Sequence, residues 1–276
     1  MITNELQETR DAWNHIAAGY SEFVGPTHMW ISNQGLDRAG VTSGTRFLDV
    51  ACGSGALSIP AARRGADVLS VDLSPSMLKQ LDAWAREEGL ANLETRAMDG
   101  HELELEDDTF DVAGSQYGVM LFPDLPRGIS ELRRVTKPDG KVVVIAYGPA
   151  SEVEFLGFFT TAMQAVVPGF EGLPTDPPPL PFQAADPAVL RQRLEESGLL
   201  NVTVDTVIEK LEFETGQQMW DWVVNSNPIA VMLTADLTEE QERAVREVLD
   251  SLLRERAGGG GSAVLTNPVN IAVGTK

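Results

Sequence analysis

Residues 46–55 read RFLDVACGSG, and this stretch decides the fold expected for the chain. The apolar run at 47–50 predicts a short strand, and the small residues after it predict a turn into a helix over 56–64. Gly53 and Gly55 suit such a turn because a Cβ would block close backbone approach or disfavour a positive φ. A strand, a glycine turn and a helix N-terminus bring backbone N–H groups and a positive helix dipole close to a ligand.

A second apolar run, VLSVDLS at 68–74, places Asp72 at the end of the next predicted strand. A carboxylate there can accept hydrogen bonds from a ribose diol. The two features together predict a site for a nucleoside-containing ligand. The dinucleotide fingerprint G-x-G-x-x-G is incomplete, because the residues from Gly53 read GSGALS and the third glycine is missing.

The order DVACGSG at 49–55 resembles motif I of the class I S-adenosylmethionine (SAM)-dependent methyltransferases, D/E-x-G-x-G-x-G, with Ala51 in place of the first glycine. The resemblance continues in order to about residue 147. Asp72 is similar to the residue that binds the ribose in that family, and Asp99 in ETRAMDG to the aspartate that meets the adenine amino group. FDVAGSQ at 110–116 resembles the fourth strand, after which the family binds the methionine part and the substrate.

The run LRRVTKPDGKVVV at 132–144 resembles the helix, turn and fifth strand of ubiquinone/menaquinone-type and other small-molecule methyltransferases. The resemblance implies SAM as cofactor, S-adenosyl-L-homocysteine (SAH) as product, and a small-molecule acceptor, for which a hydrophobic compound is one option. It implies the following cofactor-binding residues: Asp49, Ala51, Gly53, Gly55, Asp72, Leu73, Asp99, Gly100, Ser115 and Gln116. The sulfonium methyl is already activated, so orienting the reactants in line can supply most of the catalysis, roughly 7–11 kcal/mol.

The chain is expected to divide into three parts. Residues 1–43 form a helical lid, 44–147 the SAM-binding core, and 148–276 a substrate loop and cap that also hold the last two core strands, at about 201–213 and 264–273. Further helices are predicted over 75–88, 125–136, 187–197 and 239–256. The fold class is α/β, a Rossmann-like doubly wound seven-stranded sheet whose last strand pair, as the family resemblance implies, is antiparallel. The segment 214–262 is expected to be a helical insertion within the cap.

Candidates for catalysis are few. His15 and His28 flank the N-terminal lid segment, and either could act as a base if the acceptor must lose a proton. Tyr20, in AAGYSEF, resembles a tyrosine that closes over the bound cofactor in related enzymes. Tyr117 follows the fourth strand, where the methionine end of the donor is expected, and His101 is expected at the adenine rim. An apolar substrate pocket could be lined by Met219, Trp220, Trp222 and Met232, although ordinary core packing is the safer interpretation of these residues.

Composition narrows the partners and the compartment. The net charge of the 276 residues is −20, from 41 acidic and 21 basic residues, which disfavours binding to nucleic acid or to an anionic membrane surface. The single cysteine, Cys52, excludes an intramolecular disulfide and Cys-rich metal sites, and no other metal-ligand cluster is evident. With no secretion signal and no apolar run near the ~20 residues of a membrane span, a cytoplasmic protein without membrane insertion is expected. The oligomeric state stays open.

Two other functions remain in competition. A nicotinamide-dependent oxidoreductase could use the same fold, but the third glycine is missing, and none of Tyr20, Tyr117 and Tyr147 has a lysine four residues on. A SAM-binding protein that does not methylate, such as a cyclase, stays open because fold alone does not fix function. The sequence also leaves open whether the acceptor atom is carbon, oxygen, nitrogen or sulfur.

Overall fold

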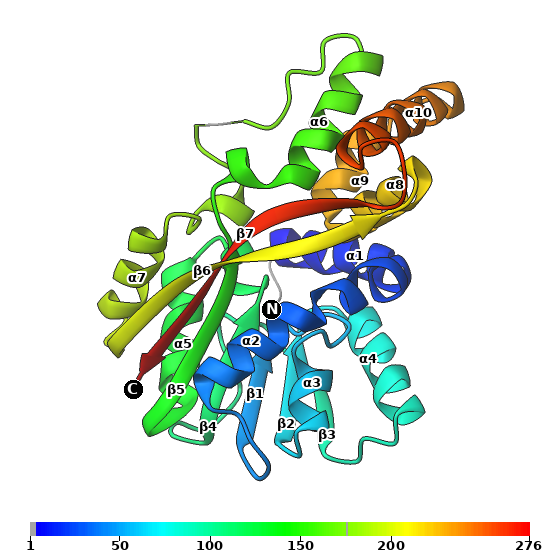
Figure 1. Ribbon diagram of the computed structural model, residues 1–276. Helices are drawn as coiled ribbons and strands as arrows, with labels where there is room; N and C mark the ends of the chain where they lie inside the picture. Colours follow the sequence, from blue (N-terminus) through cyan, green and yellow to red (C-terminus); the bar gives the residue numbers. More distant parts are fainter. Residues whose placement is uncertain (1–3, 175) are drawn as a thin grey trace.

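The computed structural model describes residues 4–174 and 176–276 and is built around one seven-stranded sheet, in the order β3-β2-β1-β4-β5-β7-β6 (Figure 1). The strands are β1 (Arg46–Val50), β2 (Asp67–Asp72), β3 (Leu93–Ala97), β4 (Phe110–Gln116), β5 (Thr136–Tyr147), β6 (Leu200–Phe213) and β7 (Ala263–Thr275). The first five strands pair in parallel, and β7 runs antiparallel between β5 and β6. This topology confirms the predicted Rossmann-like sheet with an antiparallel last pair.

Helices cover both faces of the sheet (Figure 1). They are α1 (Asn4–Gly19), α2 (Met29–Ala39), α3 (Ser58–Arg63), α4 (Pro75–Glu87), α5 (Leu125–Val135), α6 (Glu154–Val166), α7 (Pro187–Glu196), α8 (Gly216–Ser226), α9 (Pro228–Thr234) and α10 (Glu239–Arg256). Short turns of helix are η1 (Tyr20–Val24, π-helical) and the 3₁₀ turns η2 (Gly25–His28), η3 (Val119–Leu121), η4 (Ala150–Glu152) and η5 (Leu180–Phe182). The helices α2 and α3 pack on one face, and α5 and α7 on the other.

Alternation along the strands explains why these segments read as continuous apolar runs. Phe47 and Val143 pack with α2 and α3, whereas their neighbours Leu48 and Val144 pack with α5 and α7. A parallel strand that is buried on both faces needs apolar residues at both sets of positions.

Local signals fixed the helix ends closely. The α4 helix begins after Ser74, whose hydroxyl accepts a hydrogen bond from the Met77 N–H, and a capping box between Thr238 and Gln241 opens α10. The turn expected at 138–140 differs in form. It lies inside β5 and not before it, because Thr136 already pairs with Phe110 of β4. The pairing then shifts and resumes between Lys141 and Val112, and Asp139 has a φ of 65°.

The two antiparallel strands extend beyond the rest of the sheet and carry the predicted helical insertion. Because β5 pairs only with residues 269–275 of β7, the first half of β7 pairs with β6 alone, and α8, α9 and α10 pack around this extension together with α6 (Figure 1). Met219, Trp220 and Trp222 are buried in this apolar cluster, and Met232 is exposed to solvent. The first three residues therefore pack in the core and Met232 faces solvent, and none of the four lines the apolar cavity described below.

The N-terminal segment has two structural roles. The helix α2 belongs to the cover of the sheet, since Ile31 and Leu36 are fully buried against it. The helix α1 is tied to the start of α4, because the Asn14 side-chain oxygen accepts hydrogen bonds from the Ser74 hydroxyl at 2.7 Å and the Ser76 N–H at 3.1 Å. Of the predicted lid, α2 therefore belongs to the cover of the sheet, and α1, η1 and η2 are left as the candidate lid.

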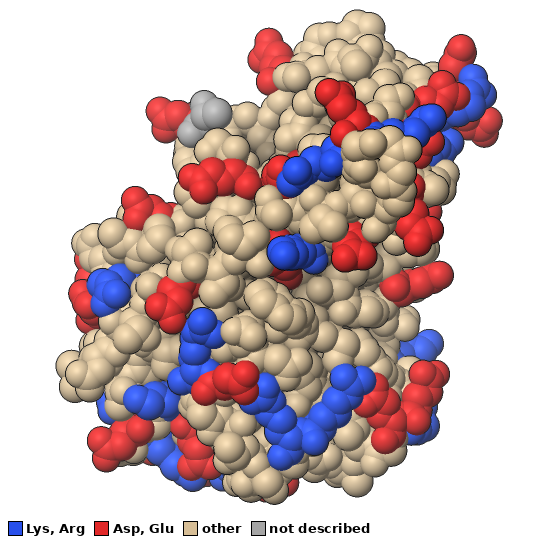
Figure 2. All heavy atoms as spheres, in the orientation of Figure 1, with Lys and Arg blue, Asp and Glu red and all other residues tan. Residues whose placement is uncertain are grey.

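Charged side chains of both signs share the surface. On the face shown in Figure 2, lysine and arginine side chains lie among aspartate and glutamate side chains. Two of the ion pairs join elements distant in sequence, Arg38 with Asp205 and Arg64 with Asp37. Among the helices of the described ranges, none is both long and apolar enough to cross a membrane.

Candidate functional site

A cleft of about 460 Å³ opens where the carboxyl ends of β1, β2 and β4 meet, the usual ligand position in an open α/β sheet. Eight of the ten predicted cofactor-binding residues line it: Asp49, Ala51, Gly53, Asp72, Leu73, Asp99, Gly100 and Gln116. They come from four strand ends that the parallel sheet brings to one edge. The cleft thus gathers most of the predicted site.

The glycine turn is held in place by Asp72. Its carboxylate accepts hydrogen bonds from the Gly53 N–H and the Ser74 N–H, each at 2.8 Å. Both Gly53, at φ 54°, and Ala51, at φ 55°, adopt the left-handed region, which glycine enters without strain. Burial raises the pKa of Asp72 to about 6, although the two N–H donors act in the opposite direction.

Asp49, at the end of β1, carries an unused acceptor. Its Oδ2 accepts a hydrogen bond from the Ser58 hydroxyl at 2.5 Å, whereas Oδ1 is buried and has no hydrogen-bond partner among the described residues. Burial raises the pKa of Asp49 to about 7. Since buried polar atoms are almost always paired, an orphaned carboxylate oxygen lining a cleft fits a ligand with a cationic donor.

The remaining two predicted cofactor residues, Gly55 and Ser115, do not line the cleft. Gly55 has φ 102°, and a Cβ on it would lie 2.3 Å from Leu81 Cδ1, so this glycine allows α4 to pack against the turn. The buried Ser115 hydroxyl accepts a hydrogen bond from the Val119 N–H at 3.0 Å and shapes the chain after β4. Both residues lie in the wall of the cleft with their side-chain positions directed into the protein, so they support the shape of the site.

At the other end of the cleft, Asp99 and His101 form one unit. Asp99 Oδ1 lies 2.9 Å from both the backbone nitrogen and the ring Nδ1 of His101, and the His101 ring lies 4.3 Å from that of Phe122. Gly100 permits this arrangement, because a Cβ on it would lie 2.5 Å from the Phe122 ring. A flat rim of this kind suits a heterocyclic ring.

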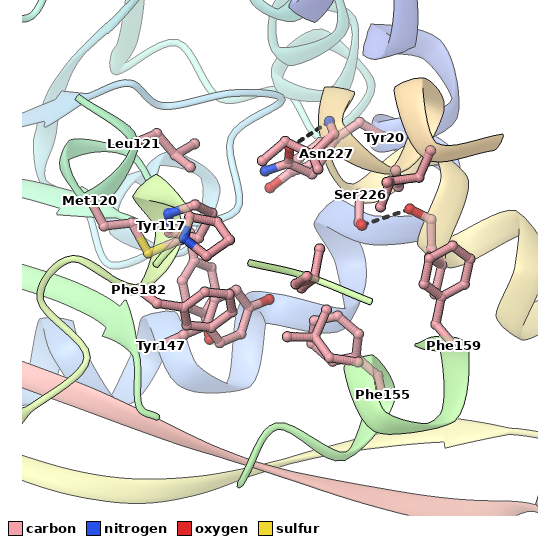
Figure 3. Close-up of a pocket in the computed structure, with 18 of the residues that line it drawn as sticks. Tyr20, Tyr117, Met120, Leu121, Tyr147, Phe155, Phe159, Phe182, Ser226 and Asn227 are labelled. Atoms are coloured by element: carbon pink, nitrogen blue, oxygen red, sulfur yellow. Dashed lines mark hydrogen bonds between the residues drawn. The ribbon is translucent and has the colours of Figure 1, made fainter. Parts of the chain in front are cut away.

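A second cavity, of about 100 Å³, lies beside the cleft and is almost entirely apolar. Figure 3 shows the rings of Tyr147, Phe155, Phe159 and Phe182 around it, with Ser226 and Asn227 above Tyr147 and Phe155 in this view. The following residues line both this cavity and the cleft: Trp13, Tyr20, Tyr117 and Leu121. The two cavities therefore share a wall, and that wall contains the predicted lid tyrosine.

Tyr20 reaches this wall through an irregular backbone. The chain changes from α-helix to a π-helical turn at Tyr20 and then to a 3₁₀ turn that ends at His28. Such π-helical turns occur often at functional sites. A Cβ on Gly53 would lie 3.6 Å from the Tyr20 ring, so this ring packs directly over the glycine turn.

Besides Ser226 and Asn227, the apolar cavity has a polar corner at His28. The His28 Nδ1 lies 2.9 Å from Glu209 Oε1, and the Tyr117 hydroxyl donates to Glu209 Oε2 at 3.2 Å. Both partners are buried, with exposed fractions of 2% for His28 and 1% for Glu209. The sequence prediction missed Glu209, although a signal existed: it shares a strand face with the buried residues Leu211 and Phe213.

Comparisons with known proteins agree with this geometry. A family described as "Methyltransferase domain" matches residues 48–144. An uncharacterized protein of Mycobacterium tuberculosis (strain ATCC 25618 / H37Rv) is 34% identical over 189 residues, 68% of this chain and 66% of its own. Nocamycin O-methyltransferase of Saccharothrix syringae is 36% identical over 110 residues, 39% of each chain.

A phosphoethanolamine N-methyltransferase 2 of Haemonchus contortus, solved with phosphomonomethylethanolamine and SAH, shares the fold at 19% identity with a TM-score of 0.54, over 88% of this chain and 52% of that one. Residues 48–144 form a methyltransferase domain of the class I SAM-dependent family. The matches span 66% of the M. tuberculosis relative and 39% of the nocamycin enzyme, so they do not reach the full length of these relatives.

The cofactor of this methyltransferase is SAM, and the cleft fits it on the structure's own evidence. The orphaned Asp49 oxygen and the buried Asp72 carboxylate match a ligand that carries positive charge and a ribose diol. The remaining predicted residues are the candidates for catalysis. His15 is exposed on α1 and lines neither cavity, whereas His28 and Tyr20 line the apolar one. In the described part of the methyltransferase, no group of three or more His, Cys, Asp or Glu side chains could hold a metal ion.

Proposed function

We propose that this methyltransferase transfers the methyl group of SAM to a small hydrophobic molecule held in the apolar cavity. The wall that the cleft and the cavity share, formed by Trp13, Tyr20, Tyr117 and Leu121, carries this proposal. A methyl donor in the cleft and an acceptor in the cavity would meet at that wall, which is the arrangement an in-line displacement needs.

Bound SAM supplies a methyl group on a sulfonium, from which a neutral thioether departs. The chain's own residues bind and orient the reactants. Asp72 would hold the ribose hydroxyls, Asp99 the adenine amino group, and Asp49 the cationic end of the methionine part. Tyr20 and Trp13 would close the site and exclude water, which strengthens each electrostatic contact inside it.

Three observations support a small hydrophobic acceptor. The cavity is enclosed by aromatic side chains, and no Asp, Glu, Lys or Arg is found among its described lining residues. The name of the Saccharothrix relative specifies O-methylation of nocamycin, a small-molecule acceptor. The sequence resemblance to ubiquinone/menaquinone-type enzymes points to an apolar acceptor. The loop before α7 contributes Pro179 and Phe182, and the insertion contributes Asn227, so the C-terminal part would act as the acceptor's cap.

A ligand comparison tests the cofactor half of the proposal. At 100 times its Kd, a ligand stabilises the folded protein by about 2.7 kcal/mol. We expect SAM and SAH to raise the unfolding temperature by several degrees, and NADH and NADPH to leave it unchanged. A shift with the nicotinamides alone would instead establish the oxidoreductase alternative.

The transfer itself is tested by incubating the protein with SAM and a panel of small aromatic compounds and measuring SAH by mass spectrometry. We expect SAH to form together with a methylated compound. Tight SAM binding without SAH formation across the panel would favour the other alternative, a SAM-binding protein that does not methylate.

A further inference from the structure

We propose that the acceptor is a flat aromatic or enolic molecule with a hydroxyl group, and that His28, oriented by Glu209, takes the hydroxyl proton during methylation. This inference rests on the proposed function, since it assigns the chemistry of the same cavity. His28 is then a catalytic residue, and Glu209 is a positioning residue that acts through it.

The contacts of the His28 ring define which nitrogen can act. With the Glu209 carboxylate 2.9 Å from Nδ1, the neutral ring keeps its proton on Nδ1 and leaves a lone pair on Nε2. In the described residues, Nε2 has no hydrogen-bond partner, although the ring is buried and lines the cavity. Nε2 is therefore placed to accept a proton from a bound molecule.

The other polar groups at this corner do not compete for the proton. Burial and the charge of Glu209 raise the pKa of both the Tyr117 and the Tyr147 hydroxyl well above 10, so both stay protonated. Burial also raises the pKa of Tyr20, with Asp72 and Glu209 adding to the effect. Ser226 and Asn227, across the cavity, are neutral. His28 is thus the one described lining side chain of a type that accepts protons near neutral pH.

The presence of an oriented general base, His28, in the cavity indicates that the acceptor is a hydroxyl group. A neutral amine can attack with its lone pair, whereas a neutral hydroxyl is a poor nucleophile until its proton leaves. In the proposed step the O–H proton moves to His28 Nε2, the oxygen forms a bond to the methyl carbon, and the carbon–sulfur electron pair stays on sulfur. Positive charge passes from the sulfonium to the imidazolium, where the Glu209 carboxylate stabilises it.

The shape of the cavity selects a flat ring. The rings of Tyr117 and Tyr147 stack at 4.4 Å with an angle of 18° between their planes, and Phe155 meets Tyr147 edge-on at 5.8 Å. An aromatic ring can extend such a stack with favourable offset geometry. The volume of about 100 Å³ is of the same order as the engineered ~150 Å³ cavity that binds benzene.

The first test needs neither acceptor nor turnover. The chain has three histidines, so ¹⁵N-histidine labelling with the variants His15→Asn and His101→Asn assigns the His28 signals by elimination. In the SAH complex, at a pH high enough for the His28 signals to be those of a neutral ring, we expect the proton on Nδ1. A proton on Nε2, with Nδ1 bare, would overturn the proposal.

The second test uses 4-nitrophenol, whose phenolate absorbs visible light, as a probe of proton transfer in the SAH complex. At a pH one unit below the pKa of free 4-nitrophenol, we expect binding to raise its ionised fraction several-fold toward full ionisation. His28→Asn and Glu209→Gln should abolish the rise, and the matched control His15→Asn should keep it. No spectral change in the wild-type protein, or an equal rise in His28→Asn, would overturn the proposal.

These readouts separate the inference from the proposed function. SAH binding, measured by calorimetry in the same samples, reports on the cofactor cleft and should be unchanged in His28→Asn and Glu209→Gln. If the wild-type protein did not bind SAH, the result would count against the methyltransferase site itself. Normal SAH binding with an Nε2-protonated His28 would reject only the base and the hydroxyl acceptor.

Discussion

The substitution Asp49→Asn should stabilise the ligand-free protein at pH 8, and the gain should shrink toward pH 5. Asp49 is 1% exposed, and burial raises its pKa from 3.8 to about 7. Folding is therefore opposed by the ionised carboxylate. Because the folded state binds the proton more tightly, stability is highest below pH 4 and is lost progressively as the pH rises to about 7.

The size of the effect follows from the two pKa values. At pH 5 the loss is about 1.6 kcal/mol, from 1.36 × (5 − 3.8), and above pH 7 it reaches about 4 kcal/mol, from 1.36 × (7 − 3.8). The amide that Asp49→Asn introduces would bury an unpaired N–H group, which costs about 1–3 kcal/mol at every pH. That cost cancels in the comparison between pH values, so the advantage of the amide over the carboxylate should grow by about 2–3 kcal/mol from pH 5 to pH 8.

Urea unfolding of both proteins at pH 5 and pH 8 measures this difference directly. Asp111→Asn provides a matched control, because the Lys137 ammonium holds the pKa of Asp111 below its usual range, so this carboxylate stays ionised at both pH values. The stability difference between Asp111→Asn and wild type should therefore stay constant from pH 5 to pH 8 and change only in more acidic solution. A stability difference between Asp49→Asn and wild type that stays constant from pH 5 to pH 8 would refute the reasoning, whatever its sign.

Three further predictions address the cleft. Asp72→Ala removes the acceptor for the ribose and for the Gly53 N–H, so calorimetry should show SAM affinity falling about 10–100-fold; equal affinity would remove Asp72 from the site. Tyr20→Phe should slow turnover while the free energy of unfolding stays within about 0.5 kcal/mol, and equal turnover would leave the ring of Tyr20, without its hydroxyl, as the lid. Gly55→Ala should destabilise the fold by about 2 kcal/mol or more, because its Cβ would meet Leu81 at 2.3 Å; an unchanged unfolding temperature would contradict the packing role.

The core of the fold could be predicted because its signals are local. The apolar runs give the strands, Ser74 and the Thr238–Gln241 box start their helices, and Gly53 marks the turn, each acting on neighbours within a few residues. Parallel strands then bring their carboxyl ends to one edge, which is why eight of ten predicted cofactor residues line one cleft. Gly55, in the glycine turn, and Ser115, in β4, do not line it, because neighbouring residues of a turn or a strand can face opposite sides; a cofactor role for these two residues stays a prediction.

The acceptor side was decided by tertiary structure. His28 and Glu209 stand 181 residues apart in the chain, and the wall between the two cavities combines Trp13 and Tyr20 with Tyr117 and Leu121. A motif can state that a carboxylate follows a strand, but it cannot state which distant side chain that carboxylate will meet.

The sequence by itself therefore determined the parallel strands and the glycine turn, since these depend on local periodicity and on a few neighbouring residues. The resemblance of its motifs to the class I methyltransferases implied the cofactor and the antiparallel last strand pair. Tertiary structure alone decided the partner of His28. Glu209 faces the site because the β6–β7 register pairs it with Asn267, and a shift by one residue would turn it to the opposite face of the sheet. Register depends on packing over the whole strand pair and on α8–α10 between the strands, which no short stretch of sequence records.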